Sequence, residues 1–315
     1  MNPKMNLKAI DDAEKAAAGL SNIRSFLVMW NGSVVSENYY RGATAATLHH
    51  ARSITKSIVS VLIGIAIDQG LISSVDDKVL DYIPELQSQD NDLRKNQITI
   101  KHLLTMTSGF QWTETGEWFF SATSAAISDA WKRPLVGNPG EIYNYDSPST
   151  DLLTVILTRA TKRDARTFAT ENLFAPLGIA HFEWEQDPAG YHRGSAGLAM
   201  RAQDLAKIGQ LYLQNGQWNK HQIVSTEWIE ESVAPHVRVN EAISYGYLWR
   251  SREVSSIHHY FGMGYGGQYL MVVPKLKIVV AANHNWQVSG EEADRQKYDF
   301  TDQVFDPMLE AWPIP

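Results

Sequence analysis

The stretch Ala51-Arg-Ser-Ile-Thr-Lys-Ser-Ile-Val-Ser-Val-Leu-Ile-Gly-Ile-Ala-Ile-Asp-Gln-Gly70 decides the fold of this chain of 315 residues. On a helix, the three-residue step from Ser53 to Lys56 places a hydroxyl and an amine side by side. The apolar run from Ile58 to Ile67 predicts that the helix is buried. Burial disfavours a charged lysine and would lower the pKa of Lys56 from about 10.4 to roughly 7–8. We therefore expect Lys56 to take the proton of Ser53 and make it a nucleophile.

A Ser-x-x-Lys motif is short enough to occur by chance. In the alternative interpretation, Ser53 only caps an amphipathic helix and Lys56 extends into solvent. The local pattern leaves both interpretations open, so the remaining sequence has to decide between them.

The overall composition is that of an ordinary folded protein, with 44% hydrophobic and 20% charged residues. The net charge of −7 and the lack of a Lys/Arg-rich cluster argue against a nucleic-acid partner. Cysteine is absent, which excludes disulfides, thiolate catalysis and sulfur-ligated metals. We find no secretory signal, and the apolar runs are too short for a membrane span. We expect a cytoplasmic protein, or a periplasmic one if a leader was removed.

Strand-like segments lie near both ends of the chain, and the dipeptide Asn31-Gly32 favours a type I′ hairpin turn between the first two. These segments are residues 24–30, 33–40, 268–273 and 278–282. The middle of the chain has helical spacing, in residues 98–107, 149–160, 165–173, 202–214 and 226–233, and a helix is expected over 291–312.

This order of segments predicts an α+β fold. An antiparallel sheet built from both chain ends is flanked by helices, and a mostly helical lobe is inserted into it. The expected lobes are residues 1–75 with 190–315, and residues 76–189, forming a single catalytic unit. A cleft between two such lobes is a usual place for a site.

A second motif, Pro139-Gly-Glu-Ile-Tyr-Asn-Tyr145, precedes the predicted helix that follows Ser147. The Pro-Gly pair predicts a turn, which would leave Tyr145 in a loop. A phenol near a lysine can relay a proton between a nucleophile and a leaving group. The alternative is a core tyrosine with a hydrogen-bonded hydroxyl.

A third motif, Phe261-Gly-Met-Gly-Tyr-Gly-Gly-Gln268, leads directly into a predicted strand. Glycines allow a substrate to approach the backbone, and an N–H at a strand edge can be half of an oxyanion hole. A glycine-rich bend that crosses a neighbouring segment is the structural alternative. The ten histidines include two adjacent pairs, His49-His50 and His258-His259, whose members point apart, and no metal-binding motif is present, so we expect no metal site and no cofactor.

Together these motifs resemble the serine β-lactamase and penicillin-binding protein superfamily. Two further segments are similar to it, Leu103-Leu-Thr-Met-Thr-Ser-Gly-Phe110 and Gly197-Leu-Ala-Met-Arg-Ala-Gln-Asp-Leu-Ala-Lys207. The likeness covers roughly residues 24–285. Within the superfamily, the chain resembles most the class C-like serine hydrolases of the family VIII carboxylesterase or 6-aminohexanoate-dimer hydrolase type.

The resemblance implies that Ser53 is the nucleophile, Lys56 its base partner and Tyr145 the phenol. It also implies an oxyanion hole made by the backbone N–H groups of Ser53 and Tyr265. Two departures follow from the same alignment. Ser147 stands where β-lactamases usually have Asn, and Gly262-Met263-Gly264 replaces a Lys-Thr-Gly triad, which leaves no cation for a β-lactam carboxylate. We assign Ser147, Trp118, Trp249 and Gly264 to the substrate pocket.

These observations predict a serine hydrolase that cleaves a carboxylic ester or small amide through an acyl-enzyme on Ser53. A β-lactamase or D-amino-acid peptidase is one alternative. A penicillin-binding or sensor protein that acylates without turnover is another. The expected partner is a small-molecule ester or amide, and the oligomeric state stays open.

Overall fold

A computed structural model of the protein describes residues 5–114 and 130–312. Its centre is an eight-stranded sheet in the order β2-β1-β13-β12-β11-β10-β9-β8, with antiparallel neighbours throughout. The strands are β1 (Ile23–Trp30), β2 (Ser33–Tyr39), β8 (Val237–Arg238), β9 (Ser244–Tyr245), β10 (Arg250–Val254), β11 (Ile257–Gly264), β12 (Gln268–Val273) and β13 (Ile278–His284). Strands from both chain ends thus form one sheet, and the predicted α+β class is confirmed.

The first hairpin forms where Asn31-Gly32 predicts it. Both residues have positive φ, 49° and 84°, as a type I′ turn requires, and β1 pairs with β2 on either side. Asn tolerates this left-handed backbone better than most residues, and Gly carries no Cβ to clash.

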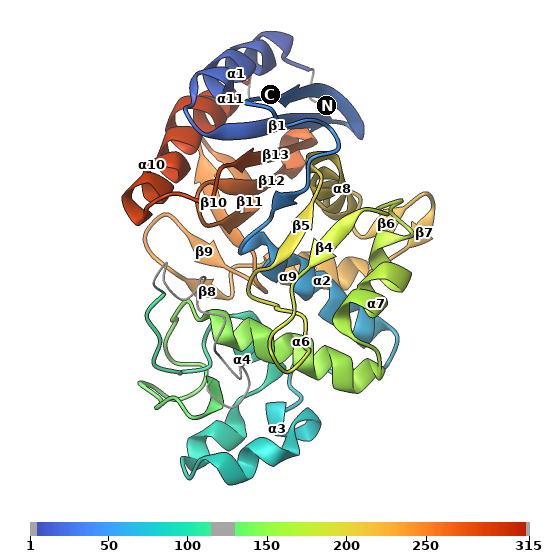
Figure 1. Ribbon diagram of the computed structural model, residues 1–315, viewed down its shortest axis with the longest axis vertical. Coiled ribbons are helices and arrows are strands. Elements are labelled where there is room, and N and C mark those ends of the chain that lie inside the picture. The colour runs from blue at the N-terminus through green and yellow to red at the C-terminus, as the bar shows by residue number, and fades with distance from the viewer. Residues whose placement is uncertain (1–4, 115–129, 313–315) are drawn as a thin grey trace.

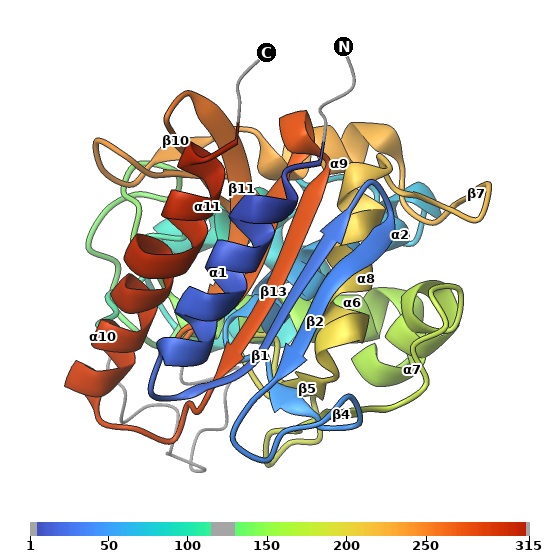
Figure 2. The ribbon, with the colours of Figure 1, turned by 90° about the horizontal axis from the view of Figure 1, so that it is seen from above.

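Helices cover both faces of the sheet, because successive strand residues point to opposite sides. In β12, Tyr269, Met271 and Val273 join one apolar core, and Leu270 and Val272 join the other. The first core is covered by α1 (Leu7–Gly19), α10 (Gly290–Phe300), a π-helical turn (Thr301–Phe305) and α11 (Asp306–Glu310) (Figure 2). The opposite face packs on α8 (Ala202–Leu213).

Helix α2 (Ile54–Asp68) connects the sheet to the helical part of the molecule (Figure 1). Every residue from Ile54 to Ala66 is buried, and the helix contacts β11 on one side and α6 (Ser147–Thr161) on the other. The helix within residues 51–70 is therefore a buried core helix that packs against both the sheet and the helical part. Its apolar residues surround the whole helix, as expected for a core helix rather than a surface one.

The helical part lies at one end of the molecule (Figure 1). It contains α3 (Val79–Tyr82), α4 (Ile100–Leu104), α6, α7 (Ala165–Ala169), 3₁₀ segments at Pro84–Gln89 and Leu93–Gln97, and a π-helical turn at Thr170–Phe174. The remaining elements are a small sheet of β3 (His49–His50), β5 (Leu198–Met200) and β4 (Phe182–Trp184), the hairpin β6 (Gln217–Trp218) and β7 (His221–Gln222), α9 (Thr226–Val233) and a 3₁₀ turn at Pro274–Leu276. The exact lobe boundaries at residues 75 and 190 stay a prediction.

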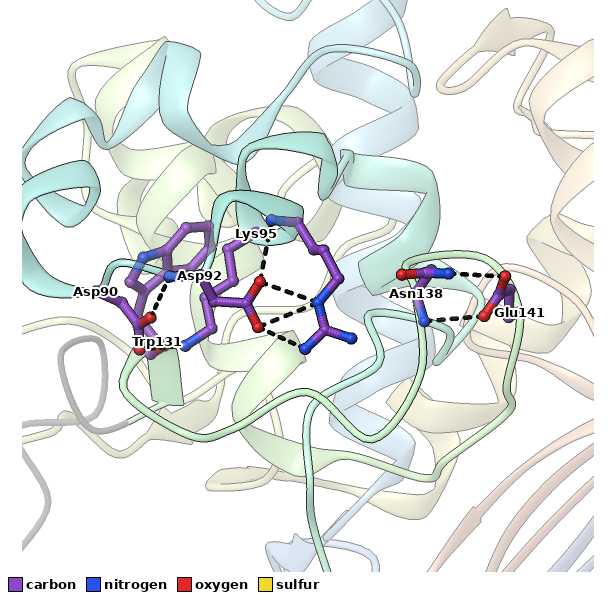
Figure 3. Close-up of polar contacts among 7 residues, drawn as sticks. Asp90, Asp92, Lys95, Trp131, Asn138 and Glu141 are labelled. Carbon is purple, nitrogen blue, oxygen red and sulfur yellow. Dashed lines mark hydrogen bonds and ion pairs between the residues drawn. The ribbon is translucent and has the colours of Figure 1, made fainter.

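A buried lysine ties two loops of the helical part together (Figure 3). Lys95 is 1% exposed, and its Nζ donates to the Asp90 carboxylate and to the backbone oxygen of Trp131. The hydrogen bond that Lys95 donates to its carboxylate holds the pKa of Asp90 below its usual range. A buried ammonium needs such partners to offset its desolvation.

Candidate active site

Ser53 stands at the N-terminus of α2, directly after a strained residue. Arg52 has φ 51°, a left-handed conformation that non-glycine residues rarely adopt. Ser53 is nearly buried and its side chain makes no capping hydrogen bond. Lys56 is 1% exposed and does not extend into solvent. The alternative interpretation of this motif, a capping serine and a solvated lysine, is therefore wrong.

The amine of Lys56 is directed at Ser53. Its Nζ lies 3.0 Å from the Ser53 Oγ and donates at 2.7 Å to the backbone oxygen of Ser195. It also lies 5.0 Å from the centre of the Tyr145 ring. Helix α2 and the loop before α6 thus bring the three predicted residues Ser53, Lys56 and Tyr145 together.

The phenol of Tyr145 has an unusual electrostatic setting. Burial alone would raise its pKa. The positive charges of Lys56 and Arg250, together with a hydrogen bond from Ser53, outweigh burial and lower the pKa below the ordinary value of 10. A tyrosine in this setting loses its proton more readily than a free one.

Asp146, next to Tyr145, holds the start of α6 in place. Its carboxylate accepts from the Ser149 N–H at 3.4 Å, from the Ser108 hydroxyl at 3.2 Å and from the Ser149 hydroxyl. The carboxyl is completely buried, and burial raises its pKa to about 6 despite these hydrogen bonds. The loop that carries Tyr145 is therefore anchored by a carboxyl group that titrates in the mildly acidic range.

We expect Asp146 to make stability fall as pH rises from 4 to 6. Over this window the folded protein binds a proton that the unfolded chain, with a pKa near 3.8, has already lost. Relative to Asp146→Asn, the wild-type unfolding free energy should fall by about 2.4 kcal/mol between pH 4 and pH 7. Urea denaturation of both proteins at the two pH values measures this difference. A constant difference would contradict the raised pKa.

A second buried carboxylate lies behind Lys56. Asp151, on α6, accepts from the Ser195 N–H at 2.9 Å and from the Ser195 hydroxyl at 3.1 Å. Because the Ser195 carbonyl in turn accepts from Lys56, Asp151 fixes the peptide that orients the amine. Burial raises the pKa of Asp151. Sequence reasoning missed both residues, since no motif links positions 151 and 195 to position 56.

The glycine-rich segment passes very close to the start of α2. A Cβ on Gly264 would lie 2.5 Å from the Ala51 carbonyl oxygen and 2.9 Å from the Arg52 Cβ. A side chain there would push β11 away from Ser53. The bend is thus a backbone crossing, and it also brings Tyr265 beside Ser53, where both line one cavity.

The N–H groups at the start of α2 are mostly occupied. Those of Ile54, Thr55 and Lys56 donate to the carbonyls of residues 51, 52 and 53. The Ser53 N–H has no hydrogen-bond acceptor among the residues that the structure describes. It is the helix-terminal donor open to a ligand.

The cavity at Ser53 has a volume of about 360 Å³. It is lined by Ser53, Glu114, Tyr143, Tyr145, Val239, Ile243, Arg250, Met263, Gly264, Tyr265 and Lys297. Gly264 therefore lies where the sequence placed it. Ser147 is fully buried beside the cavity, and its hydroxyl donates to Glu114 at 2.6 Å.

Two predicted pocket residues need separate comment. Trp249 does not line the cavity, because it is buried in the core, where its Nε1 donates to the Tyr212 hydroxyl at 2.7 Å and its ring packs on Tyr260. Its assignment to the pocket is corrected accordingly. Trp118 lies outside the described residues.

Gly262-Met263-Gly264 supplies no cation, but Arg250 and Lys297 from other parts of the chain line the cavity. Arg250 lies between two aromatic rings, with its guanidinium carbon 4.7 Å from the Tyr145 ring centre and 5.4 Å from that of Tyr245. In the described part of the chain it pairs with no carboxylate. Nearby tyrosines outweigh its burial and raise its pKa, so it stays charged. The sequence offered no signal for Arg250, whose place follows from the pairing of β10 with β9 and β11.

An antiparallel sheet with a helical part packed against it, and Ser-x-x-Lys on the buried helix between them, define the class of serine hydrolases of the β-lactamase type. The chain belongs to the Beta-lactamase family, whose sequence model matches residues 11–302. The resemblance expected from the motifs is thereby confirmed.

Individual relatives agree with this family. The chain is 24% identical over 292 residues to 6-aminohexanoate-dimer hydrolase of Paenarthrobacter ureafaciens, covering 83% of this chain and 72% of that protein. The structure of a class C β-lactamase in complex with cefoxitin is similar, with a TM-score of 0.76, 16% identity, and coverage of 97% of this chain and 99% of that one. EstCE1, a hydrolase with promiscuous acyltransferase activity, has a TM-score of 0.77, 15% identity, and coverage of 95% and 99%. The two structural likenesses concern the fold.

In the described ranges, 5–114 and 130–312, no helix is long and apolar enough to cross a bilayer.

Proposed function

We propose that this protein hydrolyses a carboxylic ester or a small linear amide through a covalent ester on Ser53. The observation that carries the proposal is the 3.0 Å contact between the buried Lys56 amine and the Ser53 hydroxyl, beside Tyr145 in one cavity. A serine hydroxyl needs an adjacent base to become a nucleophile, and these two side chains can supply it.

In the first step, the Ser53 oxygen attacks the substrate carbonyl while its proton passes to the Lys56–Tyr145 pair. The lowered pKa of Tyr145 supports its phenolate as the direct acceptor, with Lys56 holding the Ser53 oxygen and stabilising the negative phenolate. The carbonyl C–O or C–N bond then breaks, and the pair returns the proton to the departing alcohol or amine. Water attacks the acyl-enzyme by the same route and releases the acid.

The developing negative charge on the carbonyl oxygen needs donors positioned before the reaction. We assign this role to the backbone N–H groups of Ser53 and Tyr265. The open Ser53 N–H at the helix terminus supports the first assignment. The close crossing at Gly264 supports the second.

Two observations bear on the substrate. Ser147, which stands at the Asn position of β-lactamases, is engaged with Glu114 and supplies no amide. Arg250 does provide a cation, so charge alone does not argue against β-lactams. The similarity to proteins described as 6-aminohexanoate-dimer hydrolase and as a hydrolase with promiscuous acyltransferase activity supports an ester or linear amide substrate.

A substrate screen tests the proposal directly. We expect hydrolysis of a p-nitrophenyl ester, of a linear amide, or of both, with kcat/KM values above that for a chromogenic cephalosporin. Cephalosporin hydrolysis at a rivalling rate would favour a β-lactamase. A mass increase on Ser53 that persists without turnover would identify a penicillin-binding or sensor protein instead.

A further inference from the structure

A second cavity of about 290 Å³ adjoins the one at Ser53. The two share four lining residues, which are Ile243, Arg250, Met263 and Lys297. The floor of the second cavity is the sheet, where Arg250, Phe261 and Met271 form a row across β10, β11 and β12. Its other wall comes from α10 and the turn after it, including Thr301.

Four charged residues line this second cavity, and two of them are ion-paired, while the Asp302 carboxylate accepts from the Thr301 hydroxyl at 3.1 Å. Arg252 pairs with Asp306 at 2.5 Å, and Lys297 pairs with Asp294. The remaining cation, Arg250, faces the rings of Tyr145 and Tyr245. Phe261, Met263 and Met271 leave an apolar floor, which suits a neutral hydrocarbon segment better than an anion.

We propose that the second cavity is a subsite for the leaving arm of the substrate, the alcohol or amine side, and that it prefers an unbranched apolar chain. The inference rests on the proposed hydrolase function. The departing atom has to lie within reach of Tyr145, which returns its proton. Arg250 lies beside the Tyr145 ring and lines both cavities. The chain attached to the departing atom therefore passes Arg250 and enters the second cavity.

The test uses acetate esters of unbranched alcohols from ethanol to octanol, with acetate release as the readout. All of them form the same acetyl-enzyme, so differences in kcat/KM report the leaving arm alone. Each methylene that enters the subsite should raise kcat/KM about three- to fourfold until the cavity is full. Ethyl esters of lengthening acids form the comparison series and should show a smaller slope.

Thr301→Trp places a large side chain in the second cavity without touching Ser53, Lys56 or Tyr145. It should flatten the dependence of kcat/KM on the length of the alcohol. Gln303→Trp, on the same turn but outside the cavity lining, is the matched control and should keep the slope.

The wild-type series alone can overturn the inference, so the test does not depend on the variant folding. Turnover with a flat alcohol series, or a steeper acyl series, contradicts the subsite and leaves the hydrolase function standing. An unchanged slope in folded Thr301→Trp also contradicts it. Absence of turnover for every ester contradicts the hydrolase function, and this inference falls with it.

Discussion

Ser53→Ala should abolish hydrolysis of a p-nitrophenyl ester while the protein stays folded. Removing the nucleophile of a covalent catalytic unit typically lowers kcat by about 10⁴-fold or more. The side-chain oxygen of Ser53 makes no capping hydrogen bond, and the Lys56 amine that donates to it keeps the Ser195 carbonyl as an acceptor, so the unfolding free energy should fall by no more than about 1–2 kcal/mol. Steady-state kinetics and urea denaturation measure the two effects. Intact-protein mass spectrometry should show no acyl adduct on the variant.

Ser57→Ala is the matched control for this experiment. Ser57 lies one turn further along α2, is also buried, and donates to the Leu248 carbonyl at 2.8 Å. Its loss should lower stability while leaving acylation of Ser53 intact. Full activity in Ser53→Ala would rule out Ser53 as the nucleophile, whatever the control shows.

Lys56→Ala should be nearly as damaging as the serine variant. Proton transfer by a positioned side chain contributes typically about 10²–10⁴-fold, and without Lys56 the Ser53 oxygen also loses its 3.0 Å partner. We expect kcat/KM to fall by about 10³-fold or more. The double variant Ser53→Ala/Lys56→Ala should be no less active than Ser53→Ala, because residues acting as one unit are not additive.

Lys95→Ala separates the chemistry of Lys56 from the cost of losing any buried lysine. Lys95 is also 1% exposed, but it pairs with Asp90 in the helical part of the molecule (Figure 3). Its loss should reduce the unfolding free energy and leave kcat/KM of the folded fraction unchanged. If Lys56→Ala, like Lys95→Ala, lowered the unfolding free energy but left kcat/KM of the folded protein unchanged, Lys56 would have no part in the reaction.

Local patterns along the chain allowed several features to be predicted. The hairpin at Asn31-Gly32 follows from the backbone preference of two residues, and the helix at Ser147–Thr161 from its apolar spacing. The grouping of Ser53 with Lys56 follows from helix geometry alone. The catalytic role of Tyr145 was predicted from its own motif and from the family resemblance. Local pattern alone could not predict its position next to Lys56, because it does not show how a loop lies against a helix.

The sequence by itself determined the buried Ser-x-x-Lys helix, the α+β class and the family, because each depends on spacing within one element or on the order of elements. Only the tertiary structure decided that Arg250 faces Tyr145, that Asp151 orients Lys56 through Ser195, and that Trp249 belongs to the core. These contacts join positions tens to more than a hundred residues apart. They depend on strand register and on the packing of α6 against α2, which no short-range periodicity encodes.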